Sequence, residues 1–336
     1  MSQNWDFQAL VMDEMSRYGT AFGSSRNGNL QLRVYEEGEA TLAGWTSAPA
    51  ALTVSSGMMA GQVVMQWLAS QAHTRVVYAP HTHPALWHTP TLAMPTSSFA
   101  DWSAQLPDQM AQLPEGPLVI ALNSVDAGHS EMFDFEWIKM LPSDRPLTLV
   151  VDDSHGIGVL GNEGRGVWAR LSGLVPPSVR LIVTASLAKA MGLPGGLILS
   201  DADTLGKLRH TSFFGGASPM APAPLAAFGR AGALYADAHE RLSRNVRLAE
   251  AVLGPTGLFR QAAGYPVFYT DHNELYAPLL ARNILIYSFA YPTPQDKPNT
   301  RLVVSAFHED EDFERLGECL NKGAYNGFCH PEERGI

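Results

Sequence analysis

The stretch that decides the fold is Leu181-Ile-Val-Thr-Ala-Ser-Leu-Ala-Lys-Ala-Met-Gly-Leu-Pro-Gly-Gly-Leu-Ile-Leu-Ser200. An apolar run, a turn of small residues, a glycine cluster and a second apolar run predict two strands joined by a turn that contacts a ligand. The turn holds Lys189 between two alanines, with no acidic residue close in sequence. Desolvation there would lower the pKa of the lysine and leave some neutral, nucleophilic amine, as Schiff-base chemistry requires. The alternative is a buried turn with an exposed lysine at its tip.

Two possible anion sites accompany the lysine. Ser186 and the backbone N–H groups of the turn could hold a phosphate beside Lys189. Upstream, Ser55-Ser-Gly57 forms a turn at the start of a helix predicted over residues 58–70, whose first N–H groups have no partner within the helix. The same turn could equally be a helix cap without a ligand.

Strands and helices alternate along the first part of the chain. The apolar patterns predict strands at 51–54, 75–79, 117–122 and 147–151, with helices at 58–70 and 102–113. This order implies a parallel sheet with right-handed crossovers, which binds ligands beyond the carboxyl ends of its strands. Asp152 and His155 follow the strand at 147–151 and belong to that edge, although an aspartate there can also be a simple helix cap.

Three histidines, His81, His83 and His88, lie within eight residues after the strand at 75–79. They permit a metal site, a histidine that stacks on or hydrogen-bonds to a ligand, or a purely structural cluster. No acidic residue or cysteine accompanies them in the sequence, which disfavours the metal.

The composition, 46% hydrophobic and 17% charged over 336 residues, is that of a soluble globular protein. The net charge of −10 would repel nucleic acids and anionic membranes, so neither is an expected partner, and any phosphate must be bound locally. No apolar run approaches the ~20 residues of a membrane span, and the N-terminus lacks the features of a signal peptide. We therefore expect a cytoplasmic protein, with Cys319 and Cys329 as free thiols.

The chain changes character beyond Ser200. A long helix is predicted over 225–253, followed by strands at 264–269, 284–290 and 301–306 and a helix at 310–322. These elements predict a smaller α+β domain. The expected organisation is an N-terminal segment (1–45), a large α/β domain (46–224), and a linking helix with a small C-terminal domain (225–336).

Two of these stretches resemble the signatures of a known family. Val151-Asp-Asp-Ser-His-Gly-Ile-Gly-Val-Leu-Gly-Asn-Glu-Gly-Arg-Gly166 resembles the Asp-Glu-Ala-His and Gly-Arg-Gly signature of the α-oxoamine synthases, which are fold-type I pyridoxal-phosphate (PLP) enzymes. Ala185-Ser-Leu-Ala-Lys-Ala-Met-Gly192 is similar to their Gly-Thr-Leu-Ser-Lys-Ala-Phe-Gly. Further matching blocks, between about residues 18 and 320, are Tyr18–Gly28, Ser55–Gly57, Thr82–His83, Ser124–Asp126 and Thr300–His308. The resemblance implies a large, mostly parallel sheet domain with helices on both faces, plus a smaller α+β C-terminal domain.

The resemblance implies PLP as cofactor and gives four side chains catalytic roles. Lys189 would hold PLP as the internal aldimine and then move the Cα proton of the bound amino acid. Asp152 would pair with the pyridine nitrogen and keep it protonated. His83 would stack on the ring, and His155 would lie beside its phenolic oxygen.

The resemblance also implies a phosphate site and a substrate site. Backbone or hydroxyl donors to the phosphate would come from Ser56, Gly57, Met58 and Ser186. Arg301 would grip the substrate carboxylate through its planar, two-pronged guanidinium. Arg26, the only charge in the loop at 18–28, is a second candidate for substrate binding.

The chain departs from the family pattern at several positions. Ala188 replaces a serine that offers a hydroxyl to the phosphate, and Phe214-Gly-Gly216 replaces a Phe-Ser-Thr block whose threonine reaches the partner subunit's phosphate. Pro84 and Tyr35 stand where the family has alanine and often histidine. The chain also starts late, without an N-terminal helix and strand that help to cover the family's active site. The cofactor phosphate would therefore have fewer side-chain donors, and the departures bear most on the acyl-donor pocket.

The sequence therefore predicts a PLP-dependent acyltransferase that condenses a small amino acid with an acyl thioester, loses CO₂ and forms an α-oxoamine. A homodimer is expected, because fold-type I enzymes have their active sites at a two-fold interface. Alternatives are another PLP enzyme (aminotransferase, aldolase or decarboxylase), or a non-catalytic or metal-binding α/β protein. No bound metal is expected.

Overall fold

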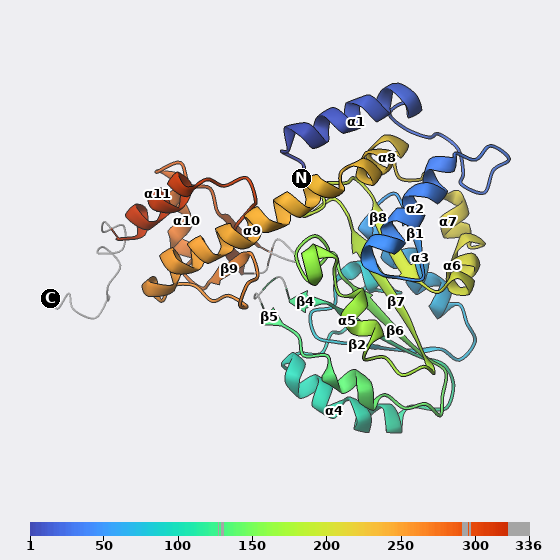
Figure 1. Ribbon diagram of the computed structural model, residues 1–336. Coiled ribbons are helices and arrows are strands. Elements are labelled where there is room, and N and C mark those ends of the chain that lie inside the picture. Colours follow the sequence, from blue (N-terminus) through green and yellow to red (C-terminus); the bar gives the residue numbers. More distant parts are fainter. Residues whose placement is uncertain (127, 129–130, 291–294, 296, 322–336) are drawn as a thin grey trace. The chain divides into compact units, whose positions relative to one another are not determined.

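The computed structural model describes residues 1–126, 128, 131–290, 295 and 297–321 (Figure 1). The chain divides into two compact units. One unit comprises Met1–Asp126 and Met132–Ala236, and the other comprises Ala127–Glu131 and Asp237–Ile336. The division therefore falls inside a helix, α9 (Gly232–Leu253), and the second unit takes a short piece from the middle of the first.

A six-stranded sheet in the order β1-β8-β7-β6-β3-β2 forms the centre of the first unit. Its strands are β1 (Ala50–Val54), β2 (Arg75–Tyr78), β3 (Leu118–Asn123), β6 (Leu147–Asp152), β7 (Val179–Ser186) and β8 (Gly196–Ser200). The four neighbours β7, β6, β3 and β2 pair in parallel, and only β8 runs antiparallel to both of its neighbours. The mostly parallel sheet predicted from the alternating pattern is present.

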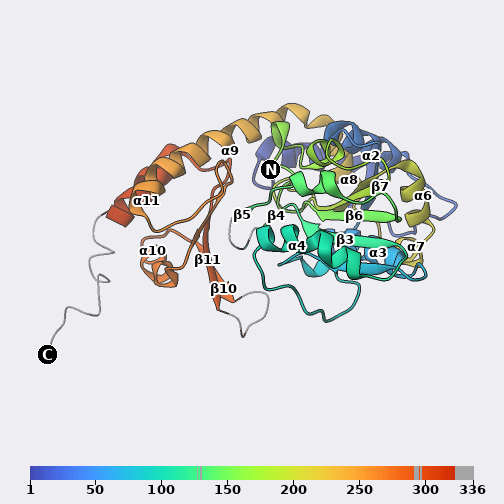
Figure 2. The same ribbon diagram turned by 90° about the horizontal axis from the view of Figure 1, so that it is seen from below.

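Helices cover both faces of this sheet (Figure 2). Because side chains alternate along a strand, β6 sends Leu149 and Val151 into one hydrophobic core and Val150 into the other. The first core is closed by α1 (Trp5–Tyr18), α2 (Arg33–Thr46), α4 (Phe99–Gln112), α5 (Trp168–Ser172) and α8 (Pro222–Arg230). The second is closed by α3 (Gly57–Ala69), α6 (Ala202–Arg209) and α7 (Ser212–Gly216).

Several of these helices begin at polar residues that cap them. The side-chain oxygens of Ser56, Ser98 and Asp201 accept hydrogen bonds from backbone N–H groups in the first turns of α3, α4 and α6. Each cap satisfies a donor that the helix itself leaves unpaired. Because only Ser55 and Ser56 separate β1 from α3, the N-terminus of α3 lies at the carboxyl end of β1.

The helices after Ser200 differ from the sequence prediction. A single helix was expected over 225–253, but α8 ends at Arg230 and α9 begins at Gly232. Ala231 takes non-helical angles (φ −101°, ψ 14°) and its N–H group donates to Phe228 O, which closes the last turn of α8. Glycines near the break weaken a continuous helix. The stretch 135–141 before β6, where the sequence pattern also indicates a helix, forms a 3₁₀ helix, Glu136–Met140.

The second unit is an α+β arrangement with its own core. Its antiparallel sheet has the order β10 (Tyr287–Ala290), β11 (Pro298–Val303), β9 (Val267–Thr270). The core also contains residues of α9, α10 (Tyr276–Leu280) and α11 (Asp310–Asn321). The Asn299 side chain donates to Gly128 O at 2.7 Å and so attaches the inserted piece to β11.

One of the two cysteines lies within the described residues. Cys319 is a buried free thiol in α11, as predicted, whereas Cys329 lies outside the described residues. The predicted end of the last helix at residue 322 also lies outside them, as does half of the proline-rich stretch 291–300, namely 291–294 and 296. Of the helices that the structure describes, none has the length and apolar character needed to cross a bilayer.

Candidate active site

The carboxyl ends of the parallel strands bring the predicted site residues together. Asp152 ends β6, where it aligns with Thr184 of β7, and Ser186 ends β7 two residues later. Gly196 of β8 aligns with both Ser186 and Val54, the last residue of β1. Residues separated by more than a hundred positions therefore share one edge of the sheet, where a parallel sheet binds its ligands.

Asp152 is buried and is held in place by the main chain. Its Oδ1 accepts a hydrogen bond from the Ser154 N–H group at 2.8 Å, and its Oδ2 lies 4.0 Å from His83 Nδ1. The neighbouring Asp153 has other contacts, because its Oδ2 accepts from the Val167 N–H group at 3.0 Å. Asp152 is thus the carboxylate of this pair that approaches His83.

Lys189 occupies a short turn that buried apolar residues fix in place. Leu187, Met191 and Leu193 are fully buried, and the Leu193 N–H group donates to Leu187 O at 2.9 Å. Lys189 itself is exposed, and its Nζ lies 2.7 Å from His155 Nε2. The chain therefore gives the lysine an imidazole neighbour, whereas the sequence suggested that apolar surroundings would desolvate it.

His83 lies near both charged groups and is held through its backbone and its ring. Its N–H group donates to Asn123 Oδ1 at 3.0 Å, and its Nδ1 accepts from the Ala85 N–H group at 3.1 Å. Burial lowers the pKa of His83; Asp152 opposes this shift and Lys189 adds to it. With Nδ1 acting as the acceptor, the neutral ring carries its proton on Nε2.

A cradle for an anion forms where α3 meets the end of β7. A Cβ atom added at Gly57 would lie 2.5 Å from the Ser186 Cβ, and one added at Gly196 would lie 2.1 Å from Ser56 O. The backbone can approach this closely only without those side chains. The N–H groups of Gly57 and Met58 precede the first helical hydrogen bond, from Ala60 N to Ser56 O, and are available for an anion at the helix N-terminus.

Three polar residues that the sequence did not single out support this edge. Ser154 is buried and its Oγ accepts from the Ser186 N–H group at 2.8 Å, which ties the two strand ends together. Burial raises the pKa of Asp153 to about 7, against the opposing effects of Ser124 and the Val167 N–H group. Asn123 aligns with Asp152 and bonds to the segment that carries His83. The only signal in the sequence was their position at strand ends.

The three clustered histidines have separate partners. His81 Nδ1 lies 2.7 Å from Asp126 Oδ2, whereas the His88 ring stacks on Tyr78 and its Nδ1 lies 2.6 Å from the Tyr78 hydroxyl. Within the described ranges, no three histidine, cysteine or acidic side chains gather as metal ligands would. The geometry of the cluster favours the role of His83 beside Asp152.

The structure corrects the assignment of Arg26 to substrate binding. Arg26 is buried, and its guanidinium bonds to both carboxylate oxygens of Glu39, at 2.7 and 3.1 Å. It also lies over the Tyr35 ring, 4.2 Å from the centroid. Glu39 receives further bonds from Arg209 and from the Thr53 N–H group. Arg26 therefore fastens the loop at 18–28 to α2 and β1, because a buried charge must be paired.

Arg301 lies on β11 in the second unit. Its guanidinium carbon lies 5.8 Å from the ring centroids of both Tyr287 and Phe289 on the neighbouring strand. Aromatic faces of this kind hold a guanidinium in a defined plane. Its role in binding a carboxylate remains a prediction.

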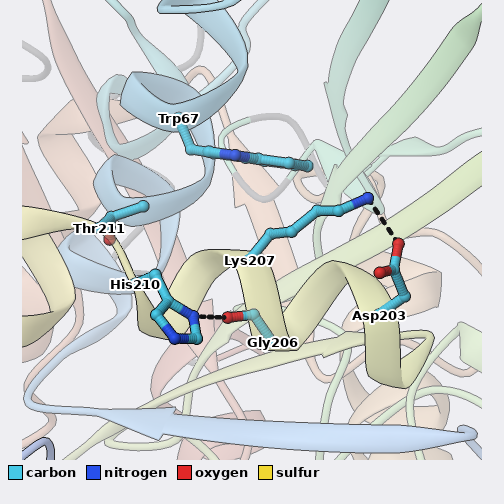
Figure 3. Close-up of a pocket in the computed structure, with 6 residues that line it drawn as sticks. All are labelled: Trp67, Asp203, Gly206, Lys207, His210 and Thr211. Carbon is cyan, nitrogen blue, oxygen red and sulfur yellow. Dashed lines mark hydrogen bonds and ion pairs between the residues drawn. The ribbon is translucent and has the colours of Figure 1, made fainter.

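An open hollow of about 580 Å³ lies on another part of the first unit (Figure 3). Its walls come from α3 and α6 and comprise Trp67, Asp203, Gly206, Lys207, His210 and Thr211. Lys207 pairs with Asp203 at 2.6 Å, and His210 Nδ1 bonds to Gly206 O at 2.7 Å. Lys207 and His210 thus bond to α6 itself, and the Thr211 hydroxyl accepts from an N–H group of α7. None of the predicted site residues lines the hollow.

Comparison with known proteins shows the family of the chain. The model of the family "Aminotransferase class I and II" matches residues 6–320, and the chain belongs to that family. The 8-amino-7-oxononanoate synthase of Aeromonas salmonicida (strain A449) is 26% identical over 353 residues, which cover 96% of this chain and 84% of the relative.

Two solved structures share the fold. The serine palmitoyltransferase of Sphingomonas wittichii has a TM-score of 0.79 at 18% identity, over 96% of this chain and 84% of that one. A structure described as SPT with PLP internal aldimine has a TM-score of 0.79 at 16% identity, over 95% and 83%.

These similarities confirm the fold-type I architecture and the resemblance to the α-oxoamine synthases. The protein is a PLP-dependent transferase of the aminotransferase class I and II family, and PLP is its cofactor. The described residues fit that cofactor, because an anion cradle at Gly57 and Ser186 lies at the same sheet edge as a lysine, a buried carboxylate and a histidine.

Proposed function

We propose that this protein condenses a small amino acid with an acyl thioester and releases CO₂ and the thiol, forming an α-oxoamine. The proposal is supported by the similarity to proteins named 8-amino-7-oxononanoate synthase. The observation that carries it is the assembly of Lys189, His155, Asp152 and His83 beside an anion cradle.

The side chains have complementary tasks in this chemistry. PLP, when bound, withdraws electrons from the substrate Cα. We assign covalent attachment of PLP to Lys189, whose Nζ then takes and returns the Cα proton, with His155 Nε2 at 2.7 Å to exchange protons with it. Asp152, a buried carboxylate, holds the proton on the pyridine nitrogen. His83 stacks on the ring, and Ser56, Gly57, Met58 and Ser186 hold the phosphate.

Arg301 binds the carboxylate of the amino acid in this proposal. A guanidinium offers two parallel donors, which orient the bonds at Cα. Arg301→Lys keeps the charge but loses this geometry, so the variant should bind amino acids roughly tenfold or more weakly and keep the spectrum of bound PLP. Arg260→Lys is the matched control, because Arg260 also lies over an aromatic ring, Tyr269, in the same unit. Unchanged affinity of Arg301→Lys for every amino acid that binds the parent would exclude the role.

The proposal also covers the location of the protein, its oligomeric state and its substrates. We expect a cytoplasmic homodimer whose subunits complete each other's sites, as is usual for closed two-fold assemblies of this fold. The substrates are then a small amino acid and an acyl thioester, carried on CoA or on a carrier protein.

The decisive experiment uses purified protein loaded with PLP. Glycine, alanine and serine are screened for a change in the visible spectrum, and those that respond are mixed with acyl thioesters while thiol and CO₂ release are measured. Equal amounts of thiol, CO₂ and α-oxoamine are expected. Transfer of the amino group to a 2-oxo acid, CO₂ release without a thioester, or aldehyde release would instead identify an aminotransferase, a decarboxylase or an aldolase.

A further inference from the structure

The side chain of Asn123 bridges the segment that delivers His83. Its Nδ2 donates to His81 O at 2.7 Å, and its Oδ1 accepts from the His83 N–H group at 3.0 Å. One amide therefore holds the main chain on both sides of Thr82. Asn123 is the last residue of β3 and aligns with Asp152, so the strand next to the buried carboxylate also positions the histidine beside it.

The main-chain position of this segment determines where the His83 ring lies. The ring Nδ1 accepts from the Ala85 N–H group at 3.1 Å and lies 4.0 Å from Asp152 Oδ2. Because the ring bonds to Ala85, which is only two residues further along the chain, a shift of the His83 backbone also moves the ring. Asn123 holds that backbone.

The segment is built in an unfavourable conformation that several side chains maintain. His81 has a φ of +56°, in the left-handed region that non-glycine residues avoid. Its Nδ1 lies 2.7 Å from the buried carboxylate of Asp126. Thr82 Oγ1 bonds to Ala79 O at 2.7 Å and lies 3.1 Å from Ala121 O. Such strain persists where the surroundings over-determine it, and it is concentrated at functional sites.

We propose that Asn123 is a positioning residue that holds His83 over the cofactor ring, with the His81–Asp126 pair anchoring the same segment. This inference rests on the proposed stacking role of His83. Asn123 ends β3 and Asp126 follows three residues later. A single short stretch of chain therefore fixes the backbone at His81 and His83 as well as the His81 ring.

The test compares Asn123→Ala, His83→Ala and the double variant, each loaded with PLP. The readouts are the dissociation constant for PLP and the circular dichroism of the cofactor band, which reports the asymmetric surroundings of the ring. Each single variant should bind PLP roughly threefold to tenfold more weakly and lose dichroic amplitude. The double variant should be no worse than His83→Ala, because Asn123 acts through His83.

Asn123→Leu and Asn245→Ala complete the design. Asn123→Leu removes both hydrogen bonds while keeping the number and branching of the side-chain heavy atoms, so it should reproduce the loss if Asn123→Ala unfolds. Asn245 likewise makes two bonds to the main chain, in which its amide donates to Ser305 O and His308 O, but it lies in the second unit. Asn245→Ala should lower the melting temperature and leave the dichroic band unchanged.

Three results would overturn the inference. Additive losses in the double variant would mean that Asn123 acts independently of His83. Unchanged PLP binding in folded Asn123→Leu would mean that it positions nothing. If His83→Ala leaves affinity and dichroism unchanged, the stacking role fails and the inference fails with it. The condensation assay on the parent protein tests the proposed reaction separately from all three.

Discussion

Two nitrogen atoms 2.7 Å apart, Lys189 Nζ and His155 Nε2, lie at the centre of the proposed chemistry. Lys189→Ala should abolish covalent attachment of PLP and lower turnover on the order of 10³-fold or more, because it removes both the attachment point and the acid–base group. Borohydride reduction followed by peptide mass analysis measures the attachment. Lys207→Ala, which loses an exposed lysine paired with Asp203, is the control. PLP fixed by borohydride on another lysine would refute the assignment.

Asp153 should make stability depend on pH. Its pKa is raised in the folded state from an ordinary 3.8 to about 7, so the folded chain binds this proton more tightly than the unfolded chain does. The stabilising contribution is therefore complete below pH 3.8 and is lost as the pH rises through about 7. The loss is at most about 4 kcal/mol.

Asp153→Asn mimics the protonated carboxyl and should remove this pH dependence. Urea unfolding between pH 4.5 and 8 should show that the variant gains stability relative to the parent as the pH rises. The two proteins should converge toward the acid end. A constant difference between them across this range would show that Asp153 does not titrate there.

Among single residues, those that belong to sequence motifs could be predicted. Those whose role depends on residues distant in the sequence could not. Lys189 and Asp152 could be named because strand ends and small-residue turns have a characteristic pattern. Arg26 could not be interpreted correctly, because its partner Glu39 lies on a separate helix and only the folded chain brings the two charges together. Asn123 gave no signal beyond its position at a strand end, since its contacts depend on the unusual backbone of His81.

Among the elements, the N-terminus of α3 has the most direct effect on the cofactor site. A Cβ at Gly57 would lie 2.5 Å from the Ser186 Cβ, so Gly57→Ala must push the helix away from β7. We expect about 1–3 kcal/mol of destabilisation and a loss of PLP affinity of roughly tenfold or more. Thermal melting of the PLP-free protein and PLP titration measure the two effects.

Gly44→Ala is the matched control for this element. Gly44 also lies in a helix, α2, but an added Cβ there would meet no described atom within 4 Å. The substitution should therefore stabilise the fold by about 0.5–1 kcal/mol and leave PLP affinity unchanged. Equal effects of Gly57→Ala and Gly44→Ala would show that the close contact at Ser186 is unimportant.

The main elements followed from hydrophobic periodicity, and the exceptions have local causes. The strands of the main sheet were predicted to within a few residues, because buried strands are short apolar runs between turns. Periodicity could not show that β8 runs antiparallel, since direction depends on the length of the connection after β7. The break at Ala231 was missed because alanine favours helix in isolation.

For the molecule as a whole, the proposed homodimer makes a prediction about Gly216. This residue stands where the resembling family has a threonine that reaches the partner subunit. This glycine lies in α7, where a Cβ would meet no described atom within 4 Å, so the packing of the described chain does not require it. Sedimentation velocity should show a dimer for the parent protein and a larger monomer fraction for Gly216→Gln. Gly206→Gln, in α6 with similarly open space, should remain dimeric. A fully active monomeric parent would contradict the proposal.

The inserted piece Ala127–Glu131 has a consequence for any attempt to exchange parts between related genes. The second unit is not contiguous in sequence, because it includes Ala127–Glu131 as well as the chain from Asp237 onward. Asn299 on β11 bonds to Gly128 of this upstream piece. A chimera with a single crossover at Asp237 would join a foreign C-terminal region to a native 127–131 piece that evolved with another sequence. Recombinants that also transfer 127–131 should fold in a larger fraction of cases, which makes this pentapeptide part of the exchangeable module.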